Sequence, residues 1–588
     1  MGLTAPSGWR RVGLDVWPLA LAAFLCGPLF VQGGYPLARD LVFVPHEPLT
    51  DSSIGLGGSA PRAVPLDAAV GVLEHVVDGA VLARIVLPLI LAAAGWGAHR
   101  LLASTGFAGR LTAAGFAVWN PFVVERLALG QWALLAAYAA LPWLALFARR
   151  WRDGERGALR PLPAWLGLAS LTATGGLLGT LMVLSCGARR RARSWWLAGI
   201  CLVVQLPWLV PSVLGAAGAK SDPSGVDAFS ADPDGPGGLV ISLLGLGGVW
   251  DAHSVPATRE SWWTPLSACV VVLVLVVAWR RLDAATGGLR SRLTVVGGLG
   301  FAIALLPHLP AGDIALRHAM DAVPGAGLLR DGQKFLAPFA LVVCLALGVA
   351  VDRAVRLVGR RLPAAAVGAA ILAALTPIVL LPDGASQPWR TLDPVPYPDA
   401  FNQIEDALDG QPGDVATLPW RGYRSFGWAH RDLTSSDPAV RWFDRTVLVS
   451  DDLQVGSTLV RGESARAHEV GVALGTEPVA VALRQYDVSW AVVYPDDPQA
   501  GELSLAGLEP VVVGGEVELY RVPGASPPPP VATWRRVLVA GTDLAVALAL
   551  VVAAAIAMTS AMTGGMARSG ARRRRRDARA GGGTVRML

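Results

Sequence analysis

An arginine and several acidic residues follow the first hydrophobic segment of the chain. Residues 35–51 read Tyr-Pro-Leu-Ala-Arg-Asp-Leu-Val-Phe-Val-Pro-His-Glu-Pro-Leu-Thr-Asp. Ionisable side chains are costly beside lipid, so this cluster indicates a functional site at a membrane face. Asp40 lies nearest the hydrophobic segment and is the predicted general base. Arg39, His46, Glu47 and Asp51 are predicted to bind substrate, and the last three could instead hold a divalent cation. A solvated polar loop is the alternative.

A second polar group joins two later hydrophobic segments. The sequence from Trp119 to Trp132 reads Trp-Asn-Pro-Phe-Val-Val-Glu-Arg-Leu-Ala-Leu-Gly-Gln-Trp. The Asn-Pro pair is predicted to end a helix, and the two tryptophans are typical of a membrane interface. An ordinary interfacial hairpin with an internal ion pair is the alternative. The residues predicted to contact substrate are Asn120, Glu125, Arg126 and Gln131.

A third group, Leu-Arg-Asp-Gly-Gln-Lys-Phe at residues 329–335, enters another hydrophobic segment. Arginine binds phosphate with a planar fork, and lysine supplies a point charge. The chain has only two lysines, so a lysine at this position indicates a specific use. Arg330, Asp331 and Lys334 are therefore predicted to bind substrate, and cations that only reach for lipid headgroups are the alternative.

The composition is that of a polytopic helical membrane protein. Of 588 residues, 53% are hydrophobic and 16% are charged, with a mean hydropathy of +0.47. Soluble domains carry about 25% charged residues, and apolar runs of about 20 residues span a bilayer. The arginine clusters lie between hydrophobic runs, where they set membrane orientation, so nucleic acid is not an expected partner.

The arginine clusters predict about twelve spans with both termini in the cytoplasm. The three polar groups then lie on one side of the plasma membrane, in loops at residues 34–80, 120–130 and 308–333. Residues 162–187 are flanked by basic clusters at both ends, so they are predicted to form two short helices that meet at residues 172–176. Broken helices of this kind survive at membrane depth only inside protein or along a cavity.

Four parts are predicted along the chain. Residues 1–382 form the membrane module, in which loop 34–80 carries an amphipathic helix with Leu66, Val70, Leu73 and Val77 on its apolar side. Residues 383–533 form an extracytoplasmic α/β domain, called the outer domain below. It is predicted to contain a helix at 401–408 and strands at 415–419, 446–449, 490–494, 511–513 and 517–522. Residues 534–560 form the last span, and 561–588 form a basic disordered tail.

This arrangement resembles the GT-C glycosyltransferases, multi-span enzymes that use polyprenyl-phosphate sugars. The resemblance rests on the acidic first outer loop and on the 119–132 and 329–335 stretches, which look like those of actinobacterial membrane proteins of this kind. It implies a fold of about a dozen spans with an outer domain near the carboxyl end. It also implies that Asp40 is the catalytic base. The adjacent acid pair frequent in the family is absent, because Arg39 precedes Asp40.

The resemblance implies inverting transfer of a sugar from a polyprenyl-phosphate donor to an envelope glycan or glycolipid. Asp40 would take the acceptor proton, while Arg330, Lys334 and Arg126 would stabilise the departing phosphate. A lipid or glycolipid transporter is one alternative, although it would need ionisable groups near the bilayer centre. A non-catalytic scaffold with an outer binding domain is the other. The enzyme hypothesis requires Asp40 and Lys334 to lie close together.

Overall fold

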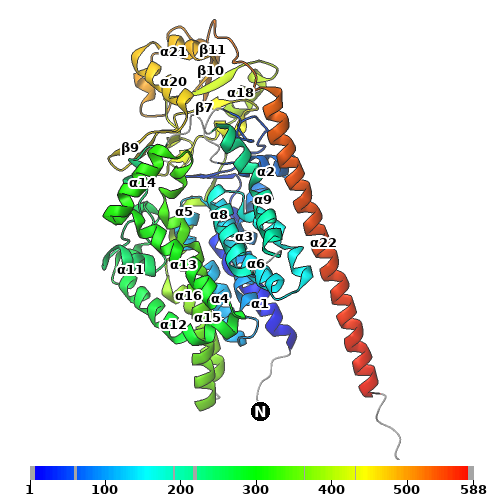
Figure 1. The fold of residues 1–588 in the computed structure, drawn as a ribbon. Coiled ribbons are helices and arrows are strands. Elements are labelled where there is room, and N and C mark those ends of the chain that lie inside the picture. The colour runs from blue at the N-terminus through cyan, green and yellow to red at the C-terminus, as the bar shows by residue number, and fades with distance from the viewer. Residues whose placement is uncertain are drawn as a thin grey trace, which may run out of the picture.

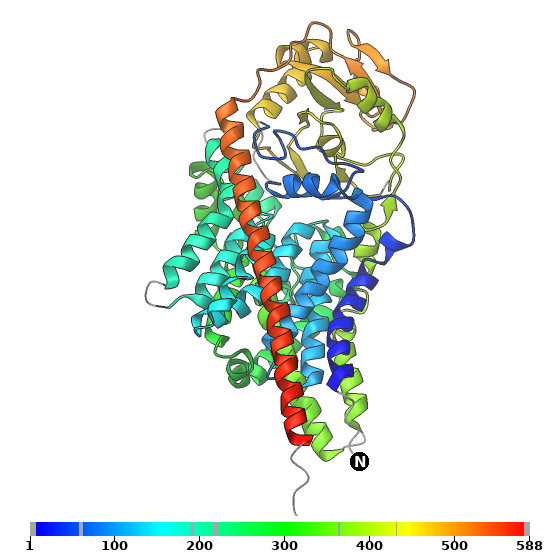
Figure 2. The same ribbon diagram turned by 90° about the vertical axis from the view of Figure 1, so that its right-hand side faces the viewer.

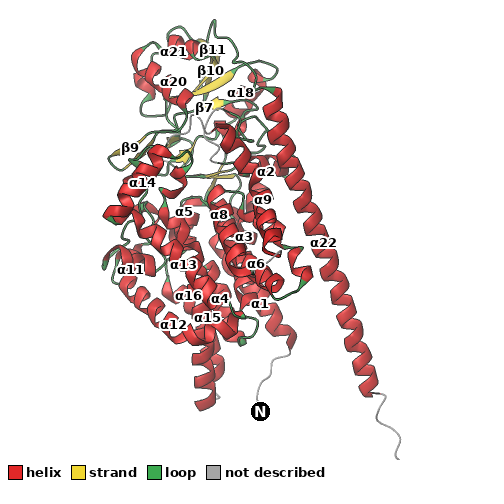
Figure 3. Ribbon diagram, viewed as in Figure 1, coloured by secondary structure: helices red, strands yellow, loops and turns green. Residues whose placement is uncertain are grey.

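The computed structural model describes residues 7–57, 63–189, 193–215, 221–362, 365–430 and 432–580. A bundle of helices carries a strand-containing domain at one end (Figures 1 and 3). The start of α1 (Ser7–Leu25) and the end of α22 (Thr533–Ala580) lie at the opposite end of the bundle (Figure 2). In the described part of the chain, the outer domain therefore lies at one end of the molecule. The start of α1 and the end of α22 lie at the other end.

The apolar helices identify a membrane protein. Within the described ranges, seven helices are long and apolar enough to cross a bilayer, and three shorter apolar segments lie in α1, α8 and α16. The seven are α3 (Gly79–Leu101), α6 (Trp132–Arg152), α9 (Arg193–Gly215), α12 (Trp263–Thr286), α13 (Arg290–Leu305), α15 (Ala337–Arg361) and α22. The predicted count of about twelve spans stays a prediction.

The predicted break in residues 162–187 is confirmed. α7 (Leu162–Ala169) ends before Thr172, and α8 (Ala173–Gly187) begins after it. The Thr172 hydroxyl accepts a hydrogen bond from the Gly175 N–H at 3.1 Å, which satisfies a free backbone donor at the new helix start.

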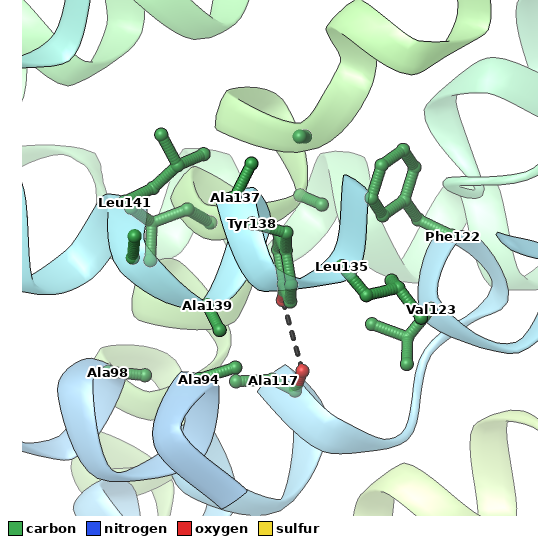
Figure 4. Close-up of a cluster of buried hydrophobic side chains, with 14 of the residues drawn as sticks. Ala94, Ala98, Ala117, Phe122, Val123, Leu135, Ala137, Tyr138, Ala139 and Leu141 are labelled. Carbon is green, nitrogen blue, oxygen red and sulfur yellow. Dashed lines mark hydrogen bonds between the residues drawn. The ribbon is translucent and has the colours of Figure 1, made fainter. Parts of the chain in front are cut away.

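Small side chains let the central helices approach closely. Ala94 and Ala98 of α3, Ala117 of α4 (Phe107–Val118) and Ala139 of α6 meet around Tyr138 (Figure 4). The buried Tyr138 hydroxyl donates to the Ala117 carbonyl at 3.1 Å. A buried hydroxyl left without a partner is costly, so this bond fixes α6 against the end of α4.

A short helix after α4 carries the second polar group. Asn120 ends the preceding helix and caps α5 (Pro121–Ala128), because its side-chain oxygen accepts from the Val123 N–H at 3.2 Å. Gly130 then turns the chain with a φ of +77° before α6 begins. A Cβ at Gly130 would lie 2.4 Å from the Leu41 nitrogen, so the turn presses directly against the first loop.

The first loop belongs to the outer domain as much as to the membrane module. β1 (Tyr35–Ala38) pairs antiparallel with β2 (Leu41–Val42) and with β3 (Pro394–Val395). Leu37, Val42 and Val44 are buried in one hydrophobic cluster with Phe401 of the outer domain. The predicted boundary at residue 383 therefore misses a segment that completes the outer domain from the start of the chain.

The secondary structure predicted for the outer domain is confirmed. The helix is α18 (Ala400–Leu408), and the five strands are β4 (Asp414–Leu418), β7 (Val447–Leu448), β10 (Val488–Val493), β11 (Glu509–Val512) and β12 (Glu518–Arg521). They form one mixed sheet in the order β11-β12-β10-β4-β7, with β10 parallel to β4 and antiparallel to β12. A hairpin of β5 (Tyr423–Arg424) and β6 (Ser435–Ser436) faces the membrane module.

The remaining elements connect these parts. They are α2 (Leu66–Glu74), α10 (Gly225–Ala228), α11 (Gly238–Leu244), α14 (Pro310–Ala322), α16 (Ala366–Leu380), α17 (Ser386–Thr391), α19 (Ala439–Trp442), β8 (Leu453–Val455), β9 (Thr458–Val460), α20 (Ala465–Thr476) and α21 (Val479–Gln485). Short 3-10 turns include Ala252–Ser254, Ala326–Leu329 and Gly332–Leu336.

The predicted amphipathic helix exists as α2, but its faces differ from the prediction. Leu66 and Val70 are buried as expected, whereas Leu73 is 49% exposed. Glu74, an acid of the same helix, is only 2% exposed. The reason is that the outer domain covers that side of α2 and buries its acids, as the contacts of Arg441 with Asp67 show.

The last helix is longer than predicted. α22 starts at Thr533 and continues past residue 560 to Ala580, through the basic run that was expected to be a disordered tail. Alanine and arginine are strong helix formers and the stretch has no proline, so the helix continues beyond the apolar span despite Gly564, Gly565 and Gly570. Residues 581–588 of the predicted tail lie outside the described ranges.

Replacing Gly130 with alanine should strain the turn beneath the first loop. We expect Gly130→Ala to lower the stability by roughly 1–3 kcal/mol, because a side chain at positive φ is strained and this one also meets the Leu41 backbone. Thermal unfolding of the purified protein in detergent measures the loss. Gly298→Ala on α13, where a Cβ meets nothing within 4 Å and alanine favours the helix, should keep or slightly raise the midpoint. Equal midpoints for both variants would contradict the turn's role.

Candidate active site

A buried ion pair joins the second and third polar groups. Arg126 is fully buried, and its guanidinium donates in parallel to both carboxylate oxygens of Asp331, at 2.7 and 2.8 Å. Burial alone raises the pKa of Asp331, but Arg126 and Lys334 together lower it to about 2. Asp331 is therefore ionised at neutral pH, and the two loops are held together by a charge-assisted bidentate contact.

Two glutamines extend this ion pair. Arg126 Nη1 donates to Gln131 Oε1 at 2.7 Å, and Arg126 Nε donates to Gln333 Oε1 at 2.8 Å. Gln131 Nε2 then donates to Asp40 Oδ2 at 3.1 Å. A continuous chain of hydrogen bonds thus runs from Asp40 in the first loop to Asp331 in the third. All three polar groups identified in the sequence meet at one place.

Asp40 is held but remains accessible. It is exposed to solvent, its backbone N–H donates to the Leu129 carbonyl at 3.3 Å, and the Tyr423 hydroxyl donates to its Oδ1. Arg39, the preceding residue, has a φ of +58°, which turns the chain between β1 and β2. A carboxylate with two neutral donors keeps further lone pairs free to accept a substrate proton.

Lys334 is a partly exposed cation at the end of this hydrogen-bond chain. Its Nζ lies 3.5 Å from Asp331 Oδ2, and its side chain is 28% exposed. Asp331 is shared with Arg126, so one negative charge faces two positive ones. The excess positive charge at Lys334 favours an anionic ligand there.

Two more predicted residues flank the site through ion pairs. Arg39 Nη2 lies 3.3 Å from Asp251 Oδ2, so the segment between α11 and α12 is a fourth contributor. Arg330 lies 3.7 Å from Glu463 of the outer domain, and its guanidinium stacks over the Phe229 ring at 4.6 Å. Both arginines are only partly exposed, at 20% and 21%.

Glu125 lies behind the site rather than in it. Burial and the charge of Asp234 raise its pKa well above the ordinary value, although Arg259 and Arg126 partly oppose this. Its Oε2 accepts a long hydrogen bond of 3.5 Å from Gln333, while Arg259 pairs with Asp234. The raised pKa of Glu125 favours its neutral, protonated form, and the side chain packs beneath Arg126.

Four residues predicted to bind substrate are placed elsewhere. Asn120 is buried and its amide donates to the Phe116 carbonyl at 2.7 Å, so its polar atoms are used in capping. Asp51 pairs with Arg536 at the start of α22. The His46 ring contacts only the Pro45 carbonyl in the described structure. Glu47 turns toward α2 and the outer domain, and its N–H donates to Glu74 Oε2 at 2.6 Å.

Glu47 belongs to a cluster of three buried acids around one arginine. Arg441 Nη2 lies 2.9 Å from Asp67 Oδ1, and its Nε lies 3.9 Å from Glu47 Oε2. Burial raises the pKa of Glu47 and of Asp67, and raises that of Glu74 to about 8. One arginine cannot neutralise three ionised carboxylates, so part of the cluster carries protons at neutral pH.

The divalent cation expected as an option has no ligand set here. His46, Glu47 and Asp51 do not gather around Asp40, and the described ranges contain no group of three or more His, Cys, Asp or Glu side chains that could hold a metal ion. Asp331 is the other acid in the hydrogen-bond chain that contains Asp40. Its carboxylate is already paired with the side chains of Arg126 and Lys334. These described residues do not fit a metal centre.

A shallow hollow opens beside the turn that carries Arg39. Arg39, His253, Arg390 and Asp432 are among its lining residues. Arg390 pairs with Asp432 in this lining and Arg39 pairs with Asp251 beside it, so the hollow offers donors and acceptors whose charges are largely balanced. Such a lining suits a polyhydroxylated ligand more than a phosphate.

Four functional residues have little or no signal in the sequence. Gln333 lies inside the third motif but was not singled out, whereas Asp251, Tyr423 and Glu463 come from segments that were given no chemical role. Tyr423 and Asp40 are 383 residues apart. Contacts over such separations depend on how the outer domain is seated, which no local pattern reveals.

Two isosteric substitutions can test whether Asp331 is ionised while Glu125 is neutral. Asp331→Asn leaves Arg126 buried without its counter-ion, and breaking a buried pair costs roughly 3–5 kcal/mol. Glu125→Gln replaces a protonated acid with a neutral amide, so we expect a much smaller change. Thermal unfolding and protein yield measure both. A larger loss for Glu125→Gln than for Asp331→Asn would show that the charges are assigned the wrong way round.

The acid cluster predicts a pH dependence of stability. Because the folded state raises the pKa of Glu74 from 4.5 to about 8, it retains a proton that the unfolded chain releases. The contribution of Glu74 to the free energy of unfolding is therefore fully present below pH 4.5, and it is lost as the pH rises toward and through 8. Glu74→Gln should flatten this slope and raise the unfolding temperature at pH 8. Glu509→Gln on the exposed edge of β11 is the control, and an unchanged slope in Glu74→Gln would contradict the protonated state.

Comparison with known proteins identifies the fold. No family profile matches the chain, and no curated protein sequence matches it either. The cryo-EM structure of arabinofuranosyltransferase AftD from mycobacteria aligns with 89% of this chain at 19% identity and a TM-score of 0.53. The alignment covers 40% of AftD, so this chain spans less than half of that protein. The Archaeoglobus fulgidus oligosaccharyltransferase aligns with a TM-score of 0.37 and 11% identity, over 83% of this chain and 70% of its own.

The similarity to AftD shows that this chain shares a fold with that protein, which agrees with the resemblance noted in the sequence. At this level of identity the likeness concerns the fold, and activity has to be argued from the site.

Proposed function

We propose that the chain is a membrane glycosyltransferase that moves a sugar from a polyprenyl-phosphate donor to a glycan or glycolipid acceptor. The observation that carries the proposal is the meeting of Asp40 with Lys334 through Gln131, Arg126 and Asp331. A solvent-exposed carboxylate and a partly exposed cation at one site are what such a transfer needs. The fold shared with an arabinofuranosyltransferase supports the same reaction class.

In the proposed reaction, Asp40 accepts the proton of an acceptor hydroxyl. The hydroxyl oxygen forms a bond to the anomeric carbon of the donor, on the face opposite the phosphate. The bond from that carbon to the phosphate oxygen breaks, and its electron pair stays on the leaving polyprenyl phosphate. Inversion at the anomeric carbon follows from this single displacement, and a positioned base of this kind contributes about 10²–10⁴-fold in rate.

Lys334 is the residue assigned to the leaving phosphate. Arg126 was expected to help, but it is fully buried and its donors are used by Asp331, Gln131 and Gln333. Arg126 therefore positions the loops without contacting substrate. Arg330 is partly exposed and can add a second cation if its contact with Glu463 opens. Charge that develops on the phosphate is stabilised best by groups fixed in advance, which the Asp331 contact provides for Lys334.

The hollow beside Arg39 is assigned to the acceptor sugar, since its paired arginines and acid match hydroxyl groups. The active face is the one that carries the outer domain, and we place it outside the cytoplasm. A transporter remains the second candidate class. The gathering of charged groups at one end of the bundle, rather than at its middle, favours surface chemistry over transport.

Two substitutions separate the roles of base and phosphate ligand. Asp40→Asn should lower sugar transfer by about 10²–10⁴-fold while still binding decaprenyl phosphate. Lys334→Met should weaken decaprenyl phosphate binding by roughly 10–100-fold, because a hydrogen bond to a charged group contributes about 1.5–3 kcal/mol. Transfer is assayed with a panel of synthetic polyprenyl-phosphate pentoses and hexoses, beginning with arabinofuranose.

The control is Lys220→Met, which removes the other lysine of the chain. It should leave binding and transfer unchanged. Transfer from none of the panel, or full transfer by Asp40→Asn, would contradict the proposed reaction.

A further inference from the structure

The outer domain touches the membrane module at the candidate active site itself. The β5–β6 hairpin lies against the turn between β1 and β2: the Arg39 N–H donates to the Thr434 carbonyl at 2.8 Å, and the Ser436 N–H donates to the Arg39 carbonyl at 2.9 Å. These two backbone bonds fix the residue next to Asp40. The turn at Arg39 is thus held by hydrogen bonds between the first loop and the outer domain.

Tyr423, on β5 of this hairpin, donates its hydroxyl hydrogen to Asp40 Oδ1. Gln131 of the membrane module donates to the other oxygen, Oδ2. The two donors come from different domains and hold the carboxylate from two directions. A carboxylate on an exposed turn otherwise rotates freely, so this pair of bonds fixes the plane in which Asp40 can accept a proton.

The hairpin is itself rigidly mounted. Arg424, adjacent to Tyr423, is fully buried and pairs with Asp437 at 3.1 Å, while its Nη2 donates to the Pro419 carbonyl at 3.2 Å. Asp437 also accepts a hydrogen bond of 2.6 Å from the Tyr494 hydroxyl. The position of Tyr423 is therefore determined by the core of the outer domain, and any movement of that domain moves the donor on Asp40.

We infer that the outer domain completes the active site by supplying Tyr423 as a positioning residue for Asp40, and that the domain must be seated on the membrane module for turnover. This inference rests on the proposed glycosyl transfer and deepens it. Tyr423 contacts the base and not the reacting atoms. Its hydrogen bond fixes the orientation of the carboxylate that accepts the proton.

The test is Tyr423→Phe, which keeps the ring and removes the donor. With the donor sugar that the unaltered protein turns over, we expect kcat to fall about tenfold with KM little changed. The acid limb of the pH–rate profile should move to higher pH, because a hydrogen bond that stabilises the carboxylate is lost. Tyr520→Phe is the matched control: its hydroxyl donates to Glu518 within the outer domain, so rate and profile should stay unchanged.

A merely structural role for Tyr423 would lower the yield or the unfolding temperature without moving the pH profile. A variant with 3-fluorotyrosine at position 423 covers the case in which Tyr423→Phe does not fold. Its more acidic phenol is a stronger donor, so the acid limb should move to lower pH. An unmoved limb in the variant that folds would overturn the inference.

Asp40→Asn measured beside these variants separates the two proposals. If Asp40→Asn is inactive and the Tyr423 variants match the unaltered protein in kcat and in profile, the positioning role is wrong while the reaction stands. If Asp40→Asn is fully active, the assignment of the base fails first. Loss of kcat in Tyr423→Phe together with a moved acid limb and an inactive Asp40→Asn supports both.

Discussion

The buried pair of Arg126 and Asp331 is the contact on which the site depends. It joins α5 to the segment just before α15, and these two segments lie about 200 residues apart in the chain. Both partners are almost wholly excluded from solvent, so neither can be left alone without a large penalty. Because Gln131 and Lys334 are attached to opposite sides of this pair, the positions of Asp40 and of the exposed cation follow from it.

The surroundings of the pair explain why it tolerates burial. Gln131 and Gln333 accept from the remaining guanidinium donors, and Lys334 shares the carboxylate. Every donor of Arg126 thus has a partner, which a buried arginine needs. Glu125, directly behind, would add a second negative charge if it were ionised. Its raised pKa favours the neutral form, in which Asp331 alone balances the charge of Arg126.

Local patterns in the sequence predicted the parts of the fold that depend on local physics. The apolar run of β10, the strand β12 and the break at Thr172 are each set by neighbouring residues, and all three were predicted. The three polar loops were also identified, because ionisable residues beside lipid are rare enough to be conspicuous. Those patterns could not show which way a side chain points. Glu47 and Glu74 point toward Arg441, and Glu125 points into the protein interior.

The contacts between domains account for most of these differences. β1 and β2 join the outer domain across more than 350 residues, and that docking decides which side of α2 is covered and which acids are buried. Tyr423 reaches Asp40 by the same docking. Hydrophobic periodicity identifies a buried face but not the element that buries it, so residues such as Asp251, Tyr423 and Glu463 could be found only from the structure.

The central claim is that an acid from the start of the chain and a lysine from its middle act on one lipid phosphate. A cryo-EM structure of the full chain with decaprenyl phosphate tests it most directly. The account predicts a phosphate in contact with Lys334 Nζ, with Asp40 close enough to reach an acceptor hydroxyl beside it and the prenyl chain among the helices. A phosphate bound away from Lys334, or at the opposite end of the bundle, would contradict it.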